Sequence, residues 1–185
     1  MTLPALDDLN ALPADEFATA IAPLFEGAPA FARRLAEARP FETDADLLAG
    51  ARVVARAMPE EEQVALIDTH PRIGADPDTV SELSRPEQGY DDADADDADA
   101  DDAAGVDDPD AWVADELAAL NEAYESRFGF RFVVFVAGRP RREIIPILER
   151  AIHADRDEEL RRALDDIVHI AGDRLARLRA EPIDP

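Results

Sequence analysis

The chain has 185 residues, no cysteine, and a net charge of −24 from 43 acidic and 19 basic residues. This length suits one compact domain, and such an acidic surface should repel nucleic acid and anionic membranes. Because every basic residue is an arginine, a lysine Schiff base is excluded, and the lack of cysteine excludes a disulfide, a thiolate nucleophile and a cysteine metal site.

The excess of acid without lysine leads to the hypothesis of a halophilic protein, adapted to a cytoplasm where the Debye length falls to ~3 Å at 1 M salt. No apolar run approaches the ~20 residues that span a bilayer. The first residues, MTLPALDDLN, also lack the pattern of a signal peptide. We therefore expect a soluble, cytoplasmic protein.

Two short helices are predicted near the start of the chain. Residues 13–25 place Phe17, Ile21 and Leu24 on one helical face, and the second proline of this segment should kink or end the helix. Residues 29–38 form the second helix.

Thr43 can cap a third helix, whose apolar side is Leu47, Val54 and Met58. The next segment, PEEEQVALIDT, begins with a proline and carries three glutamates in its first turn, where the helix dipole favours them.

The PEEEQVALIDT helix should bury Val64 and Ile67 and end near His70. Pro71 sets that end, because a proline disfavours helical geometry at the residue before it.

An acidic low-complexity insertion occupies about residues 90–108 and includes the run DDADADDADADD. Such a run cannot bury apolar surface, so it is interpreted as a long solvated loop. A cation site is the alternative, although dedicated calcium loops space their ligands around a glycine turn that this run lacks.

After the insertion, Asp110 can cap a helix that ends at Gly129. The apolar stripe of this helix is predicted to be Val113, Leu117, Leu120 and Tyr124.

The apolar segment FRFVVFVAG (130–138) has β-rich composition, but one strand cannot make a sheet, so a short buried extended segment is predicted. Residues 140–152 should form a helix around Pro146, and residues 156–180 the longest helix. The predicted stripe of the last helix is Leu160, Leu164, Ile167, Ala171, Leu175 and Leu178. A single all-α, multi-helix domain over residues 1–185 follows.

His70 admits two interpretations. It could end a helix, with its imidazole interacting favourably with the helix dipole, or it could be a general acid or base, because histidine titrates nearest neutrality. His153 and His169 are weaker candidates, and His169 should point away from the buried stripe of its helix.

Ser84 and Glu87 have the spacing of a capping box, which is a structural interpretation. A glutamate there could instead orient a histidine or bind a substrate N–H group. Arg174 falls on or beside the apolar stripe of the last helix, so it needs an anionic partner. That partner could be an internal carboxylate or the carboxylate of a substrate.

Taken in order, these motifs resemble the OHCU decarboxylase family, whose substrate is 2-oxo-4-hydroxy-4-carboxy-5-ureidoimidazoline. The resemblance covers nearly the whole chain except the acidic insertion. The segments that carry it are RPF (39–41), THPRIG (69–74), SRPEQ (84–88), LNEAYESRFGFRFVVFVAG (120–138) and DIVHIAGDRL (166–175).

The resemblance implies an all-helical homodimer, without cofactor or metal, that makes (S)-allantoin in uric acid breakdown. It implies that His70, Glu87 and Arg174 are catalytic, with Glu87 orienting His70 or setting its protonation. Arg174 would hold the substrate's carboxylate or ureido carbonyl. The residues implied to contact the substrate are Pro71, Ser84, Gln88, Phe132, Val133, Val134 and Phe135.

Three other functions stay open at this point. One is a non-catalytic helical interaction module that uses the acidic insertion as its binding element. Another is a related lyase that acts on a different ureido acid. The third is a cation-binding regulator, which would lose its function if residues 91–104 were deleted.

Overall fold

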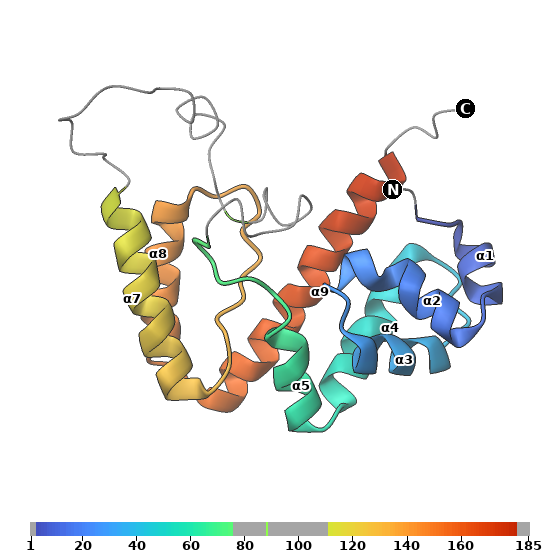
Figure 1. The fold of residues 1–185 in the computed structure, drawn as a ribbon, viewed down its shortest axis with the longest axis horizontal. Helices are drawn as coiled ribbons and strands as arrows, with labels where there is room; N and C mark the ends of the chain where they lie inside the picture. Colours follow the sequence, from blue (N-terminus) through green and yellow to red (C-terminus); the bar gives the residue numbers. More distant parts are fainter. Residues whose placement is uncertain (1–2, 76–87, 89–110, 181–185) are drawn as a thin grey trace. The chain divides into compact units, whose positions relative to one another are not determined.

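The structure is a computed structural model of the chain, and it describes residues 3–75, 88 and 111–180. All regular secondary structure in these ranges is helical, which confirms the predicted all-α class (Figure 1). The chain divides into two compact units: unit 1 comprises residues 1–70 and 160–185, and unit 2 comprises residues 71–159. The single domain remains a prediction, and the acidic insertion lies outside the described residues.

Unit 1 is built from short helices with breaks at prolines. Its helix α2 packs on α3, and α3 packs on α4. Its elements are α1 (Leu6–Ala11), α2 (Ala14–Ile21), the 3-10 helix η1 (Ala22–Leu24), α3 (Pro29–Glu37), α4 (Asp44–Ala57), α5 (Glu60–Ile67) and most of α9 (Arg156–Ala180).

The helix ends in unit 1 follow the capping signals in the sequence. Thr43 accepts a hydrogen bond from the Asp46 backbone N–H at 3.0 Å, which confirms the predicted cap of α4. Pro23 lies in η1, where the α-helical hydrogen-bond pattern of α2 has ended. The predicted face formed by Phe17, Ile21 and Leu24 is fully buried.

Two predicted core positions in unit 1 are wrong. Val54 and Val64 are only half-buried, and α5 instead buries Gln63 together with its apolar neighbours Leu66 and Ile67. Gln63 tolerates burial because its amide donates a hydrogen bond to the Arg56 carbonyl at 3.0 Å.

The last helix, α9, has the predicted bounds. All six apolar positions predicted for its stripe are buried, and Arg174 lies among them with 1% of its surface exposed. His169 is exposed, which confirms that it points away from this stripe. Among the described helices, none is both long and apolar enough to cross a membrane.

Unit 2 contains α7 (Ala111–Phe128) and α8 (Arg141–Ala151), which pack side by side (Figure 1). Gly129 ends α7 as predicted, with φ +77° and a backbone hydrogen bond to the Glu125 carbonyl. Leu120 is half-buried, so this member of the predicted stripe is wrong, and Asn121 is the buried residue instead. Trp112 lies in the first turn of α7 and is 55% exposed.

Residues 130–136 run between α7 and α8 without forming a strand, and most of their apolar side chains are buried. The Tyr124 ring packs edge-on against Phe132, with ring centroids 5.2 Å apart. Its hydroxyl donates to the buried Glu159 carboxylate at 2.9 Å. The ring of Tyr124 therefore supports this extended segment, and its buried hydroxyl has a hydrogen-bond partner.

Candidate functional site

His70 is 2% exposed and lies just beyond the end of α5. Its backbone N–H donates to the Ile67 carbonyl at 3.1 Å, so the residue does take part in ending the helix. This contact uses only the backbone. The helix-ending and catalytic interpretations of His70 are therefore compatible.

The Thr69 hydroxyl indicates which nitrogen of His70 carries the proton. It donates to the Leu66 carbonyl at 2.7 Å, and its oxygen lies 3.4 Å from His70 Nδ1. Because the hydroxyl hydrogen is used at Leu66, the oxygen can act only as an acceptor toward Nδ1. This favours a proton on Nδ1, which leaves Nε2 as the nitrogen that can gain or lose a proton.

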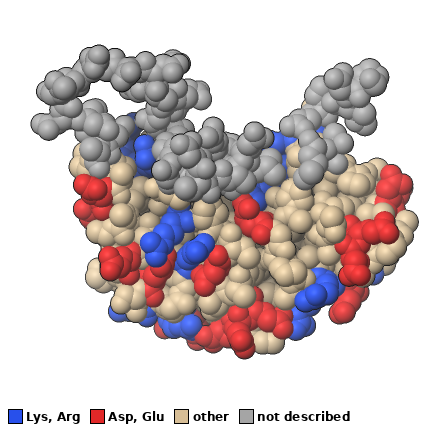
Figure 2. Space-filling view, in the orientation of Figure 1, with Lys and Arg blue, Asp and Glu red and all other residues tan. Residues whose placement is uncertain are grey.

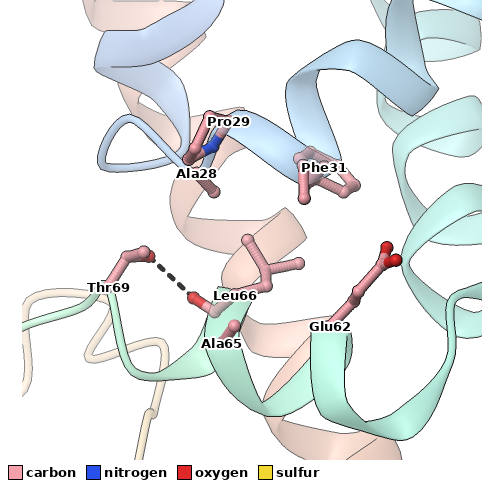
Figure 3. Close-up of a pocket in the computed structure, with 8 residues that line it drawn as sticks. Ala28, Pro29, Phe31, Glu62, Ala65, Leu66 and Thr69 are labelled. Atoms are coloured by element: carbon pink, nitrogen blue, oxygen red, sulfur yellow. Dashed lines mark hydrogen bonds between the residues drawn. The ribbon is translucent and has the colours of Figure 1, made fainter.

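An apolar hollow of about 140 Å³ lies beside Thr69, between the start of α3 and α5. In Figure 3, Phe31 and Leu66 border it, and Glu62 stands at one side. Its lining residues are Ala28, Pro29, Ala30, Phe31, Glu62, Ala65, Leu66 and Thr69. The lining has little polar surface, so it does not suit a flat polar substrate.

Arg174 is engaged by one group in η1 and by one in the turn that follows it. Its Nη2 lies 2.5 Å from the Glu26 carboxylate, and its Nη1 donates to the Pro23 carbonyl at 3.0 Å. Glu26 has a left-handed backbone, with φ +50°. The internal ion pair left open by the sequence is therefore present, and no signal in the sequence singles out Glu26 as the partner.

Gln88 is 3% exposed, and its side-chain oxygen accepts the Gly74 backbone N–H at 2.9 Å. The neighbouring residue, Ile73, is held from α7, where the Asn121 amide donates to the Ile73 carbonyl at 3.0 Å. The contact with Gly74 uses the oxygen of the Gln88 amide. Asn121 lies in the LNEAY motif, and nothing in that motif alone indicates its contact with Ile73.

The predicted substrate-contacting segment, residues 132–135, has two buried and two half-buried members. Phe132 and Val133 are buried, and Val134 and Phe135 are half-buried. The Phe135 carbonyl accepts a hydrogen bond from the Arg139 guanidinium. This carbonyl therefore helps to fix the turn that follows.

Ser84 and Glu87 lie outside the described residues, and so does their proposed capping box. Among the predicted residues, His70 and Arg174 belong to unit 1, whereas Pro71, Gln88 and residues 132–135 belong to unit 2.

Several charged side chains form pairs on the surface, and Figure 2 shows acidic and basic side chains close together. The Glu125 carboxylate beside Arg72 raises the pKa of that guanidinium through a hydrogen bond and charge attraction. The Arg34 guanidinium lowers the pKa of the Glu62 carboxyl, chiefly through a hydrogen bond. Such pairs favour the charged forms and are screened by salt.

A second hollow, of about 430 Å³, lies on unit 2 where Leu120 faces the end of α8. Glu149, Arg150, Ile152 and His153 complete its lining. His153 is exposed there. Within the described ranges, no three histidine or carboxylate groups are placed to hold a metal ion.

The sequence profile described as OHCU decarboxylase matches residues 10–176. The chain belongs to the OHCU decarboxylase family. This membership confirms the resemblance that the ordered motifs indicate, and it favours a decarboxylase over an interaction module.

Relatives of this OHCU decarboxylase family member include bacterial and halophilic proteins. The chain is 30% identical over 176 residues to the "uric acid degradation bifunctional protein PucL" of Bacillus subtilis (strain 168), covering 95% of this chain and 33% of that protein. It thus spans about a third of that bifunctional protein. It is 29% identical over 171 residues to the "2-oxo-4-hydroxy-4-carboxy-5-ureidoimidazoline decarboxylase" of Haloferax volcanii, covering 92% of this chain and 94% of that protein.

Two solved structures share the fold of this family member. The crystal structure of an (S)-allantoin synthase aligns with a TM-score of 0.65 at 17% identity, covering 95% of this chain and 54% of the other. The crystal structure of OHCU decarboxylase in the presence of (S)-allantoin aligns with a TM-score of 0.61 at 22% identity, covering 84% and 94%. At these identities the alignments establish the all-helical fold.

Proposed function

We propose that this chain decarboxylates 2-oxo-4-hydroxy-4-carboxy-5-ureidoimidazoline to (S)-allantoin in the breakdown of uric acid. Family membership supports the proposal, as does the near full-length match to the Haloferax volcanii relative of that name. The single observation that carries it is His70, a buried histidine in the THPRIG motif whose Nδ1 lies 3.4 Å from the Thr69 hydroxyl oxygen.

The chemistry needs no protein electrophile. When the bond between carbon 4 and the carboxyl group breaks, CO₂ leaves and its electron pair forms a double bond between carbons 4 and 5. The adjacent C=N bond of the substrate accepts the displaced electrons, and its nitrogen takes a proton. Loss of the hydroxyl proton and protonation of carbon 5 on one face then give one enantiomer of allantoin.

In this proposal His70 is the general base that removes the hydroxyl proton, or the acid that protonates the ring system as charge moves. Glu87 would orient His70 or set its protonation, and Arg174 would hold the carboxylate or the ureido carbonyl. The remaining substrate contacts would come from Pro71, Ser84, Gln88 and residues 132–135. We further propose a cytoplasmic homodimer adapted to high salt.

The test uses freshly generated substrate in high salt, with circular dichroism following the appearance of one allantoin enantiomer. Because the substrate also decays without a catalyst, the enzyme must raise the rate and make the product optically active. Slow formation of racemic allantoin alone would reject the proposal. Asparagine at position 70 should abolish catalysis while the helical spectrum stays unchanged, because the buried side chain keeps a similar polar shape.

The chain offers matched controls for His70→Asn. His153 and His169 are both exposed, and the same substitution there removes a histidine without touching the proposed site. Both control variants should keep wild-type activity. If His70→Asn unfolds the protein, the imidazole is needed for the structure itself, and the assignment of His70 as a purely catalytic side chain is wrong.

A further inference from the structure

A tight turn follows directly after the His70–Pro71 pair. The Ala75 N–H donates to the Arg72 carbonyl at 3.1 Å, and Gly74 has φ +78°, as the third residue of a type II turn requires. In such a turn the central peptide, here between Ile73 and Gly74, points its N–H and carbonyl away from the turn. Both groups therefore need partners from elsewhere in the fold.

Two buried side-chain amides supply those partners. The Asn121 amide donates to the Ile73 carbonyl at 3.0 Å, and the Gln88 oxygen accepts the Gly74 N–H at 2.9 Å. Asn121 is 2% exposed and Gln88 is 3% exposed. A single peptide unit is thus held at both polar groups, so it cannot rotate without losing two buried hydrogen bonds.

One face of α7 contacts this turn at three points. Leu117, Asn121 and Glu125 follow each other at intervals of four residues, so they lie along one side of the helix. A Cβ atom on Gly74 would stand 3.1 Å from Leu117, which shows how closely the backbone approaches the helix. Glu125 binds the guanidinium of Arg72 through both carboxylate oxygens.

Asn121 holds the turn at a cost. In the described part of the molecule, its side-chain oxygen is buried and has no hydrogen-bond partner. An unsatisfied buried acceptor is destabilising, and an apolar residue on this face of α7 would avoid it. What asparagine provides and leucine does not is the N–H that fixes the Ile73 carbonyl.

We propose that Asn121 is a positioning residue for the reaction. It fixes the Ile73–Gly74 peptide together with Gln88, and it thereby holds Pro71, the residue bonded to His70, in one conformation. This inference rests on the proposed decarboxylase function, because Pro71 and His70 matter to catalysis only if that reaction occurs. Asn121 acts through the turn and needs no contact with the substrate.

Asn10, the other asparagine of the chain, provides a matched control. Its amide also holds one backbone segment, donating to the Phe41 carbonyl at 2.7 Å and accepting the Phe41 N–H at 3.0 Å. Asn121→Ala and Asn10→Ala each remove such a clamp. Only Asn121→Ala should lower kcat, by about 10- to 100-fold, as misplacement of reacting groups by about 1 Å does. KM should change less, because positioning matters most in the transition state.

The outcomes separate the two proposals. If wild-type protein produces no enantiomerically enriched allantoin, the decarboxylase function fails and this inference fails with it. If wild-type protein is active and both alanine variants keep its kcat, the role of Asn121 alone is refuted. Equal losses of kcat in both variants would also refute it, because loss of stability would then explain the effect.

A second variant covers the case in which Asn121→Ala does not fold. Glu125→Gln weakens the contact between Arg72 and α7 on the exposed side of the turn, where ion pairs contribute little to stability. It should leave the unfolding midpoint unchanged and lower kcat by a smaller factor. Exchanging the two charges, with Arg72→Glu and Glu125→Arg combined, should restore kcat. Unchanged kcat in Glu125→Gln, or no recovery in the exchanged pair, would overturn the inference.

Discussion

Replacing Glu26 with glutamine would remove the carboxylate that faces Arg174, the largest fully buried side chain in the described structure. The substitution keeps the size of the side chain and can keep one hydrogen bond to the guanidinium. It removes a negative charge that lies 2.5 Å from a guanidinium whose residue is 1% exposed. We therefore expect a large loss of stability from a change of one functional group.

The magnitude follows from burial and from the contacts that remain. Removing one partner of a buried ion pair typically costs about 3–5 kcal/mol. Glu26 keeps 19% of its side chain exposed, and Arg174 retains the Pro23 carbonyl at 3.0 Å. Both features reduce the loss to about 2–3 kcal/mol, or roughly 5–10 °C in Tm for a protein of this size.

Urea unfolding at high salt, followed by far-UV circular dichroism, measures this loss. Glu62→Gln serves as the control, because Glu62 also pairs with an arginine, Arg34, but on the surface. Glu26→Gln should lower the free energy of unfolding much more than the control does. Equal losses in the two variants would refute the reasoning from burial.

The same pair can test the proposed role of Arg174 in the reaction. A double variant, Glu26→Leu with Arg174→Met, removes both charges and should recover much of the stability lost in Glu26→Gln. If Arg174 binds the substrate, this stable double variant is inactive. If it retains wild-type activity, Arg174 is structural and its proposed contact with the substrate is wrong.

Three further predictions follow from the turns and the charges. Gly74→Ala should destabilise the protein more than Gly129→Ala. Both glycines have positive φ, but of the two only an added Cβ at Gly74 would crowd a neighbour, Leu117 at 3.1 Å. Thermal unfolding of the two variants measures the difference. Dialysis into low salt should unfold the protein as self-repulsion loses its screening, and a far-UV spectrum that stays helical would contradict this. Arg34 lowers the pKa of Glu62. The contribution of this ion pair to stability should therefore be present above the ordinary pKa of a glutamate and be lost as the pH falls through the folded-state pKa. An NMR titration of the Glu62 carboxyl carbon, repeated in Arg34→Gln, checks that the pKa is lowered.

Local signals predicted most of the helices, because each boundary depends on residues close in sequence. Thr43 caps α4, and Gly129 ends α7 in the left-handed conformation that its position requires. The period of the last helix also placed Arg174 correctly on a buried face. These features depend on backbone geometry within one or two turns.

Buried polar residues were harder to predict, because their partners are distant in sequence. The apolar stripe of α7 pointed to Leu120, yet Asn121 is buried because it binds the Ile73 carbonyl 48 positions earlier. Arg174 was expected to need an anion, but Glu26, 148 positions earlier, could not be chosen among 43 acidic residues. Hydropathy patterns identify which face is covered, whereas hydrogen-bond geometry decides which polar groups can join it.

The position of Trp112 has a practical consequence for spectroscopy. It is the only tryptophan in the chain and is 55% exposed, so its emission in the native state should already resemble that of a solvated indole. Unfolding would then change the fluorescence little, even when the core is lost. Tyr124, which is fully buried among phenylalanine rings, should instead give the near-ultraviolet signal that reports tertiary packing.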